Sequence, residues 1–145
     1  MDPSTPHWSG VNLPVILPEL VVAPTRTQIF MFSAATWNRH HIHFNRDAAI
    51  AEGLPDIVVQ RALIGNYFAR QLTNWLGDSG DICELSWKVL NSAVPNQNLH
   101  CQGMATETLT ADSARYLICD LNIANDAGNV LATATAKVRL SPPFH

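Results

Sequence analysis

The chain has few charged residues and no region of strong positive charge. Only 14% of its 145 residues are Asp, Glu, Lys or Arg, and the net charge is −3. An average soluble domain has about 25% charged residues. Because clustered Lys and Arg bind phosphate backbones, the lack of any basic run argues against a nucleic-acid partner. The shortage of charge also favours an oligomer, in which another chain covers part of the surface.

Disulfide patterns and long apolar runs are missing as well. Cys83, Cys101 and Cys119 are odd in number, widely spaced and without a CxxC pair, which argues against a disulfide framework or a structural zinc site. We expect three small buried residues in a reducing compartment. The chain has no run of about 18 apolar residues, which is the length that a membrane-spanning helix needs. The first residues lack a secretory signal. We therefore expect a cytoplasmic protein that does not interact with membranes.

The length of the chain is that of one ordinary domain, and we expect a single domain over residues 1–145. Five of the nine prolines fall within residues 1–24. Prolines at this density exclude helix, so they predict an extended N-terminal arm that lies on the surface or on a neighbouring chain.

Two segments have the pattern of helices. Residues 46–52 are good helix formers that end at Gly53. Residues 58–76 place apolar side chains at helical spacing, over a face so wide that we expect most sides of this helix to be enclosed. Residues 25–33 are compatible with a strand or with the first turns of a helix.

After residue 80 the apolar period changes to two. The alternation, with turn-forming residues between the segments, predicts half-buried strands joined as antiparallel neighbours. The expected strands are residues 82–90, 98–109, 115–123 and 130–140. A long helix must cover the apolar face of this sheet. The predicted fold class is therefore α+β, with an antiparallel sheet wrapped around one long central helix, which is the hot-dog fold.

The chemistry is expected in residues 38–45, which contain three of the six histidines. A metal site is one interpretation, but His41 and His43 lack a metalloprotease spacing and only Asp47 offers a nearby acidic ligand, so we expect no metal. A polar surface loop is a second interpretation. The third is a general acid/base site, because the ordinary pKa of imidazole, about 6.5, lies close to the working pH of enzymes.

Residues 32–45 read Phe-Ser-Ala-Ala-Thr-Trp-Asn-Arg-His-His-Ile-His-Phe-Asn. This run resembles the MaoC-like hydratases and dehydratases, a group that includes R-specific enoyl-CoA hydratases and mitochondrial-type 3-hydroxyacyl-thioester dehydratases. The group carries an Asp-x-x-x-x-His element ahead of the hot-dog helix, and the mitochondrial type has Asn in the Asp position. Residues 17–20, 25–27 and 52–60 are also similar to the group, so the resemblance covers residues 17–76.

The resemblance implies a reaction and three residues that carry it. The reaction is the addition of water to a 2-enoyl thioester, or the reverse dehydration of a 3-hydroxyacyl thioester. His43 would be the general acid/base and Asn38 would position the water, with His40 in a supporting role. Since a neutral amide cannot take a proton, His43 or a water relay would have to perform both proton transfers.

The resemblance also implies an oxyanion hole at the start of the long helix, formed by Gln60, Arg61 and Ala62. Helix N-termini offer free N–H groups and partial positive charge, which stabilise a developing enolate oxygen. Many members have His-Gly where this chain has Gln60 and Arg61. The side chain of Arg61 could crowd the thioester, or it could be an ordinary salt-bridged or surface residue near the helix start.

The implied substrate is an acyl thioester of coenzyme A or of an acyl carrier protein, with no cofactor beyond the coenzyme A of the substrate. Two other functions stay open. A hot-dog thioesterase would need a carboxylate near the helix start, for which Glu52 and Asp56 are the candidates. A non-catalytic partner subunit would shape the acyl pocket of another hot-dog chain. The resemblance implies a homo- or hetero-oligomer in either case.

Overall fold

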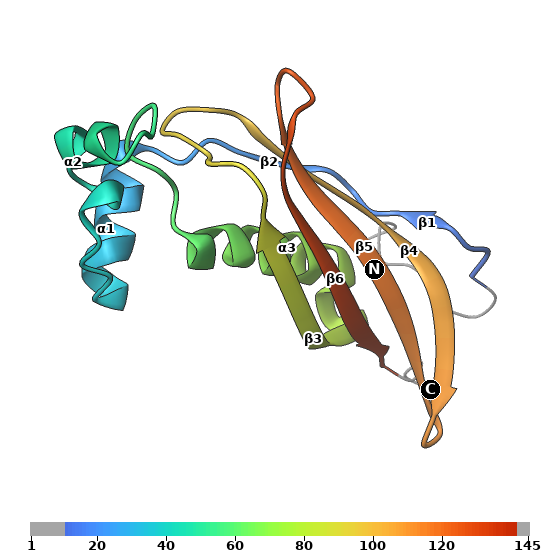
Figure 1. The fold of residues 1–145 in the computed structure, drawn as a ribbon. Coiled ribbons are helices and arrows are strands. Elements are labelled where there is room, and N and C mark those ends of the chain that lie inside the picture. The colour runs from blue at the N-terminus through green and yellow to red at the C-terminus, as the bar shows by residue number, and fades with distance from the viewer. Residues whose placement is uncertain (1–10, 142–145) are drawn as a thin grey trace.

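An antiparallel sheet of six strands dominates the computed structural model, which describes residues 11–141 (Figure 1). The order is β1-β4-β5-β6-β3, with β2 also paired to β4. The strands are β1 (Val15–Ile16), β2 (Leu20–Val22), β3 (Gly80–Val89), β4 (Leu99–Ala111), β5 (Ala114–Asn125) and β6 (Val130–Leu140). The four strands predicted from the period-two pattern are confirmed, with bounds shifted by a few residues.

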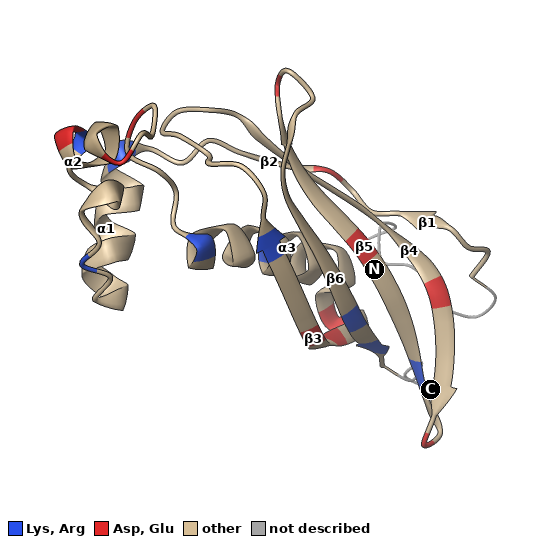
Figure 2. Ribbon diagram, viewed as in Figure 1, with Lys and Arg blue, Asp and Glu red and all other residues tan. Residues whose placement is uncertain are grey.

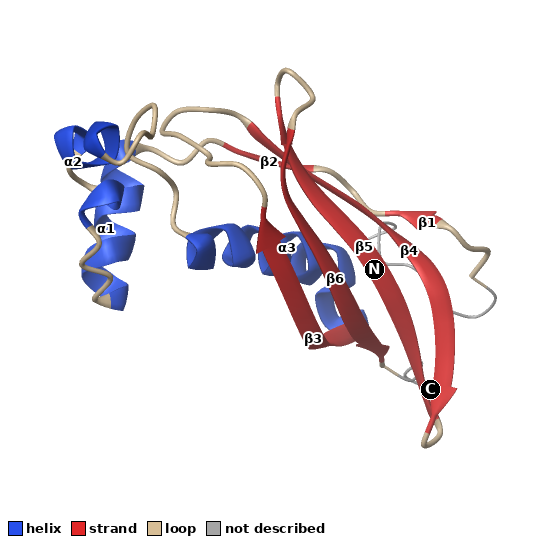
Figure 3. Ribbon diagram, viewed as in Figure 1, coloured by secondary structure: helices blue, strands red, loops and turns tan. Residues whose placement is uncertain are grey.

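The helices are α1 (Arg26–Thr36), α2 (Arg46–Ala51) and α3 (Arg61–Leu76), with short 3-10 turns η1 (His41–His43) and η2 (Gly77–Ser79). Figure 3 shows α3 along one face of the sheet, whereas α1 and α2 lie beyond the N-terminal end of α3. The α+β hot-dog fold is confirmed. Within residues 11–141, no helix is both long and apolar enough to cross a membrane.

The long helix begins three residues later than predicted. Gln60 is extended, with φ −62° and ψ 142°, and Arg61 is the first helical residue. Residues 58–60 are apolar or buried but not helical, because their backbone groups bond elsewhere: Val58 N–H donates to the Ile42 carbonyl and Val59 N–H to the Ala93 carbonyl. Residues 26–33 prove to be helical, and Thr25, which precedes them, caps this helix by accepting the Gln28 N–H.

The core lies between α3 and the sheet. Phe68 and Leu72 of α3 have no exposed surface, and they pack in one cluster with the inward side chains of β4, β5 and β6. More than half of the residues of α3 are buried, as its wide apolar face predicts, whereas one face, which includes Asn66 and Arg70, is exposed. The helix is amphipathic because the sheet covers it from one side only.

Gly65 lets strand β3 approach the first turns of α3. A Cβ at this position would lie 2.4 Å from a ring carbon of Trp87, closer than atoms can pack. The indole Nε1 of Trp87 donates to the Arg61 carbonyl at 2.9 Å. The tryptophan therefore lies directly on the helix backbone and fixes the position of its N-terminal end.

A β-bulge explains why Cys83 is exposed while the other two cysteines are buried. The pairing of β3 with β6 shifts register between Ile82 and Glu84, so Cys83 is an extra residue and is exposed. The expectation of three buried cysteines is therefore wrong for Cys83. Cys101 and Cys119 are fully buried, and burial raises the pKa of each thiol to about 12.

The described part of the predicted arm, residues 11–24, lies on the sheet's own edge: β1 and β2 pair with β4. Residues 1–10 are outside the described part of the chain. His100 of β4 reinforces this attachment through ring contacts to Glu19, at 3.2 Å, and to Asp126, at 2.7 Å. Hydrogen bonds to these carboxylates raise the pKa of His100, with Asp126 the larger cause. Elsewhere charges are sparse and of mixed sign (Figure 2).

Candidate active site

His43 is buried at the C-terminal end of η1, and the chain leading into α3 holds its ring. The residue is 7% exposed, and its Nδ1 lies 2.8 Å from the carbonyl oxygen of Val58. Because a carbonyl can only accept a hydrogen bond, Nδ1 carries the hydrogen. In the neutral ring, Nε2 therefore keeps a free lone pair.

The surroundings of His43 favour that neutral form. Burial lowers the pKa of His43 below its ordinary value of 6.5; the hydrogen bond to Val58 opposes this, and the nearby His40 lowers the pKa further. Burial has this effect because it disfavours the charged form of imidazole. A neutral ring with a free Nε2 is the state needed to take a proton from water.

Asn38 follows the end of α1 and is partly buried. Its Oδ1 accepts the His40 N–H at 3.2 Å, and its own N–H donates to the Ser33 carbonyl at 2.9 Å. The rings of His40 and His43 meet edge to face with centroids 5.9 Å apart. The structure thus brings Asn38, His40 and His43 together in one short, internally bonded segment.

The supporting His40 is on the surface. Its Nε2 lies 3.3 Å from Glu52 Oε1, and both side chains are about half exposed. An ion pair this exposed contributes little to stability. His40 therefore contributes to the segment mainly through its backbone N–H and its ring contact with His43.

The start of α3 offers backbone donors. Ile64 N–H is the first to bond within the helix, to the Gln60 carbonyl at 3.0 Å, and no side chain of Gln60 caps the helix. The N–H groups of Arg61 and Ala62 precede it, so neither has a partner inside the helix. Both residues are exposed. Gln60, in contrast, is buried, and its amide points toward α1.

The side chain of Arg61 is held against strand β3. Its guanidinium lies over the Trp87 ring, 5.3 Å from the centroid, and donates to the Trp87 carbonyl at 3.2 Å. Among residues 11–141 it forms no ion pair with a carboxylate. Of the two interpretations of Arg61 as an ordinary residue, the structure supports a surface position without a salt bridge.

Sequence patterns did not reveal the partners that orient this segment. Val58 acts through its backbone carbonyl, which any residue carries, and lies 15 positions from His43. Ser33 is buried at the end of α1 and accepts from the Gln60 amide. Ser33 stands in the run that resembles the family, but its burial and its contact with Gln60 are visible only in the structure.

The two carboxylates considered for a thioesterase are engaged elsewhere. Asp56 contacts Arg26 and Arg46, and the hydrogen bond from Arg26 is the main reason that the pKa of Asp56 is lowered. Glu52 pairs with His40 on the surface. Neither carboxylate is a free base beside the helix start.

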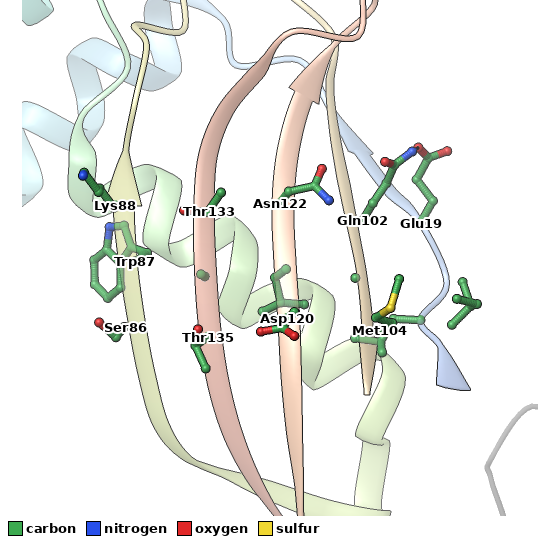
Figure 4. Close-up of a pocket in the computed structure, with 15 residues that line it drawn as sticks. Glu19, Ser86, Trp87, Lys88, Gln102, Met104, Asp120, Asn122, Thr133 and Thr135 are labelled. Atoms are coloured by element: carbon green, nitrogen blue, oxygen red, sulfur yellow. Dashed lines mark hydrogen bonds between the residues drawn. The ribbon is translucent and has the colours of Figure 1, made fainter. Parts of the chain in front are cut away.

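Two other features lie apart from this segment. Within residues 11–141, no group of three or more His, Cys, Asp or Glu is arranged to hold a metal ion. A groove of about 870 Å³ crosses the face of the sheet that points away from α3, and polar side chains such as Lys88, Asp120 and Thr133 line it (Figure 4). None of the predicted site residues lines this open groove. We therefore do not assign the reaction to it, although it is large.

Residues 16–95 match the family model described as hydroxyacyl-thioester dehydratase type 2. No curated protein matches the chain.

Solved structures share the fold at low identity. The ChsH1–ChsH2 complex from Mycobacterium tuberculosis matches at 23% identity and a TM-score of 0.80, over 90% of this chain and 99% of that one. The (R)-hydratase of A. caviae involved in PHA biosynthesis matches at 14% and 0.81, over 92% and 99%. A MaoC-like dehydratase from Rhodospirillum rubrum matches at 16% and 0.81, over 92% and 96%.

Proposed function

Because the chain belongs to the hydroxyacyl-thioester dehydratase type 2 family, we propose that it hydrates 2-enoyl thioesters or dehydrates 3-hydroxyacyl thioesters, with His43 as the general acid/base. The observation that carries the proposal is the buried His43 ring, whose Nδ1 is occupied by the Val58 carbonyl and whose Nε2 is left to accept a proton. The proposed substrate is a coenzyme A or acyl-carrier thioester, without a further cofactor.

The proposed chemistry follows from that protonation state. In hydration, Nε2 of His43 takes a proton from water while the water oxygen bonds to C3 of the enoyl group. The double-bond electrons move toward C2 and the thioester oxygen as an enolate. The protonated His43, directly or through a second water, then returns the proton to C2. Asn38 has an amide that can hold the water but cannot take its proton.

The negative charge of the enolate needs donors. The N–H groups of Arg61 and Ala62 lack partners inside α3 and lie at the positive end of its dipole, so we propose them as the oxyanion hole. The Arg61 side chain is drawn toward Trp87, an arrangement that keeps the guanidinium on β3. This position counts against crowding of the thioester by the guanidinium.

The direct test is the absorbance of crotonyl-CoA, which falls when the enoyl double bond is hydrated. We expect His43→Ala to lower the rate roughly 10²–10⁴-fold, and Asn38→Ala to lower it less. His41→Ala is the matched control, since His41 is an exposed histidine two positions away and should leave the rate unchanged. Full activity in His43→Ala would refute the assignment.

The same assay separates the alternatives. Release of free thiol in place of hydration would identify a thioesterase, although the engagement of Asp56 and Glu52 in ion pairs counts against it. Inactivity of the chain alone, with activity after a second hot-dog chain is added, would identify a partner subunit.

We also propose that the chain assembles with another hot-dog chain, identical or not. Phe30, Met31 and Trp37 at the outer end of the molecule are 56%, 61% and 75% exposed. Large apolar side chains gathered at one end are typical of an interface. Light scattering on the purified protein should give a mass of two chains or more if the partner is identical, and a monomer of 15.9 kDa would exclude an identical partner and leave only a different hot-dog chain.

A further inference from the structure

Gln60 is buried between α1 and the start of α3, and its side-chain amide has no donor left over. The residue is 1% exposed. Nε2 donates to the Ile29 carbonyl at 2.7 Å and to Ser33 Oγ at 2.8 Å. Since a backbone carbonyl can only accept, the amide orientation is fixed. Both side-chain N–H groups are used, so the side chain of Gln60 has no donor left for a substrate.

Ser33 connects Gln60 to Asn38. The hydroxyl of Ser33 accepts from the Gln60 amide, while the carbonyl of the same residue accepts the Asn38 N–H at 2.9 Å. Ser33 is itself only 5% exposed, so this link is shielded from water. Movement of the Gln60 amide would therefore be transmitted to Asn38 through one intervening residue.

The segment that carries Gln60 also holds His43. The Val58 carbonyl, two residues before Gln60, accepts from the His43 ring. We propose that Gln60 is a positioning residue, which locks the end of α1 to the start of α3 and thereby fixes Asn38 relative to His43. This inference rests on the proposed hydration reaction and concerns the side chain of Gln60, whereas the oxyanion hole implied by the resemblance uses backbone N–H groups.

The side-chain oxygen of Gln60 takes no part in this lock. Oε1 is buried and accepts from no donor within the described residues. Methionine has nearly the length of glutamine but no N–H group. Gln60→Met therefore removes the two donors that form the lock while breaking no acceptor contact.

Gln71, within α3, provides a matched control for Gln60, which precedes that helix. It is 2% exposed, its Nε2 donates to the carbonyls of Pro18 and Cys101, and its Oε1 is likewise buried without a donor. Its partners are in the N-terminal arm and in β4, not in the segment of His43. Gln71→Met should therefore reproduce the loss of stability of Gln60→Met without its effect on the reaction.

The experiment compares both variants by urea unfolding and by crotonyl-CoA hydration. We expect Gln60→Met to lower kcat roughly 10–100-fold, with KM changed by less than about threefold, because the catalytic groups are misplaced while most substrate contacts remain. In the Asn38→Ala background, Gln60→Met should cause little further loss, since it acts through Asn38. Ser33→Ala, a smaller change, should give a smaller effect of the same kind if Gln60→Met does not fold.

Two results would overturn the proposal: equal kcat losses in Gln60→Met and Gln71→Met, or losses from Gln60→Met and Asn38→Ala that simply multiply. Nuclear magnetic resonance separates failure of the lock from failure of the proposed function. If the wild type hydrates nothing, the function is wrong, but the lock still predicts that Gln60→Met, and not Gln71→Met, shifts the Asn38 amide and His43 ring signals. Unshifted signals would refute the lock.

Discussion

Replacement of Gly65 by alanine sets helix propensity against packing, and the two predict opposite signs. In a helix interior, alanine is favoured over glycine by about 1 kcal/mol. The new Cβ, however, would lie 2.4 and 2.5 Å from two ring carbons of Trp87. Overpacking of this kind costs about 1–3 kcal/mol, and displacing the indole breaks its bond to the Arg61 carbonyl, worth about 1 kcal/mol. We expect a net loss of about 1–3 kcal/mol.

Urea unfolding measures this loss. With a slope of about 2 kcal/mol per molar urea, the midpoint should fall by about 0.5–1.5 M. Asn66→Ala is the control, because Asn66 is the next residue on the exposed face of α3 and should gain a few tenths of a kcal/mol from propensity alone. In the Trp87→Leu background, Gly65→Ala should cost about 1 kcal/mol or more less than it does in the wild type, because the two sites interact directly. A variant Gly65→Ala as stable as the wild type would show that Trp87 does not pack as described.

Three further predictions concern titration and access. The lowered pKa of His43 means that its base form persists into mild acid, so the acid limb of kcat/KM should have its midpoint below pH 6.5, and a midpoint above pH 7 would contradict burial as the cause. Because the pKa of His100 is raised, its ion pairs stabilise the fold below pH 6.5, and this contribution disappears as the pH rises through the raised pKa. Because the pKa of Asp126 is lowered, its contribution to stability is present above pH 3.8 and is lost in stronger acid. His100→Gln should therefore lower the melting temperature most between about pH 4 and 6.5 and least at pH 9, and an equal effect at both would argue against the ion pairs. Iodoacetamide should alkylate only Cys83 in the native protein, as mass spectrometry can check, and labelling of the two buried cysteines without denaturant would contradict their burial.

Local patterns were sufficient for the strands and for most of the fold class. The period-two alternation in residues 115–123 put Leu117, Cys119 and Ile123 on one face, and all three are fully buried. The alternation failed at Cys83 because a bulge adds one residue to β3, and a bulge depends on the partner strand. It also could not reveal that residues 58–60 lie outside the helix, since the two valines fit either conformation.

By itself, the sequence determined that a histidine-rich segment precedes a long helix with a wide apolar face and an antiparallel sheet, because residue type and spacing decide local conformation. Only the tertiary structure decided the state of His43. The Val58 carbonyl selects the tautomer, and burial selects the neutral form. Both depend on contacts between residues far apart in the chain. Any residue at position 58 would carry the same carbonyl, so no pattern of side chains could have predicted its contact with His43.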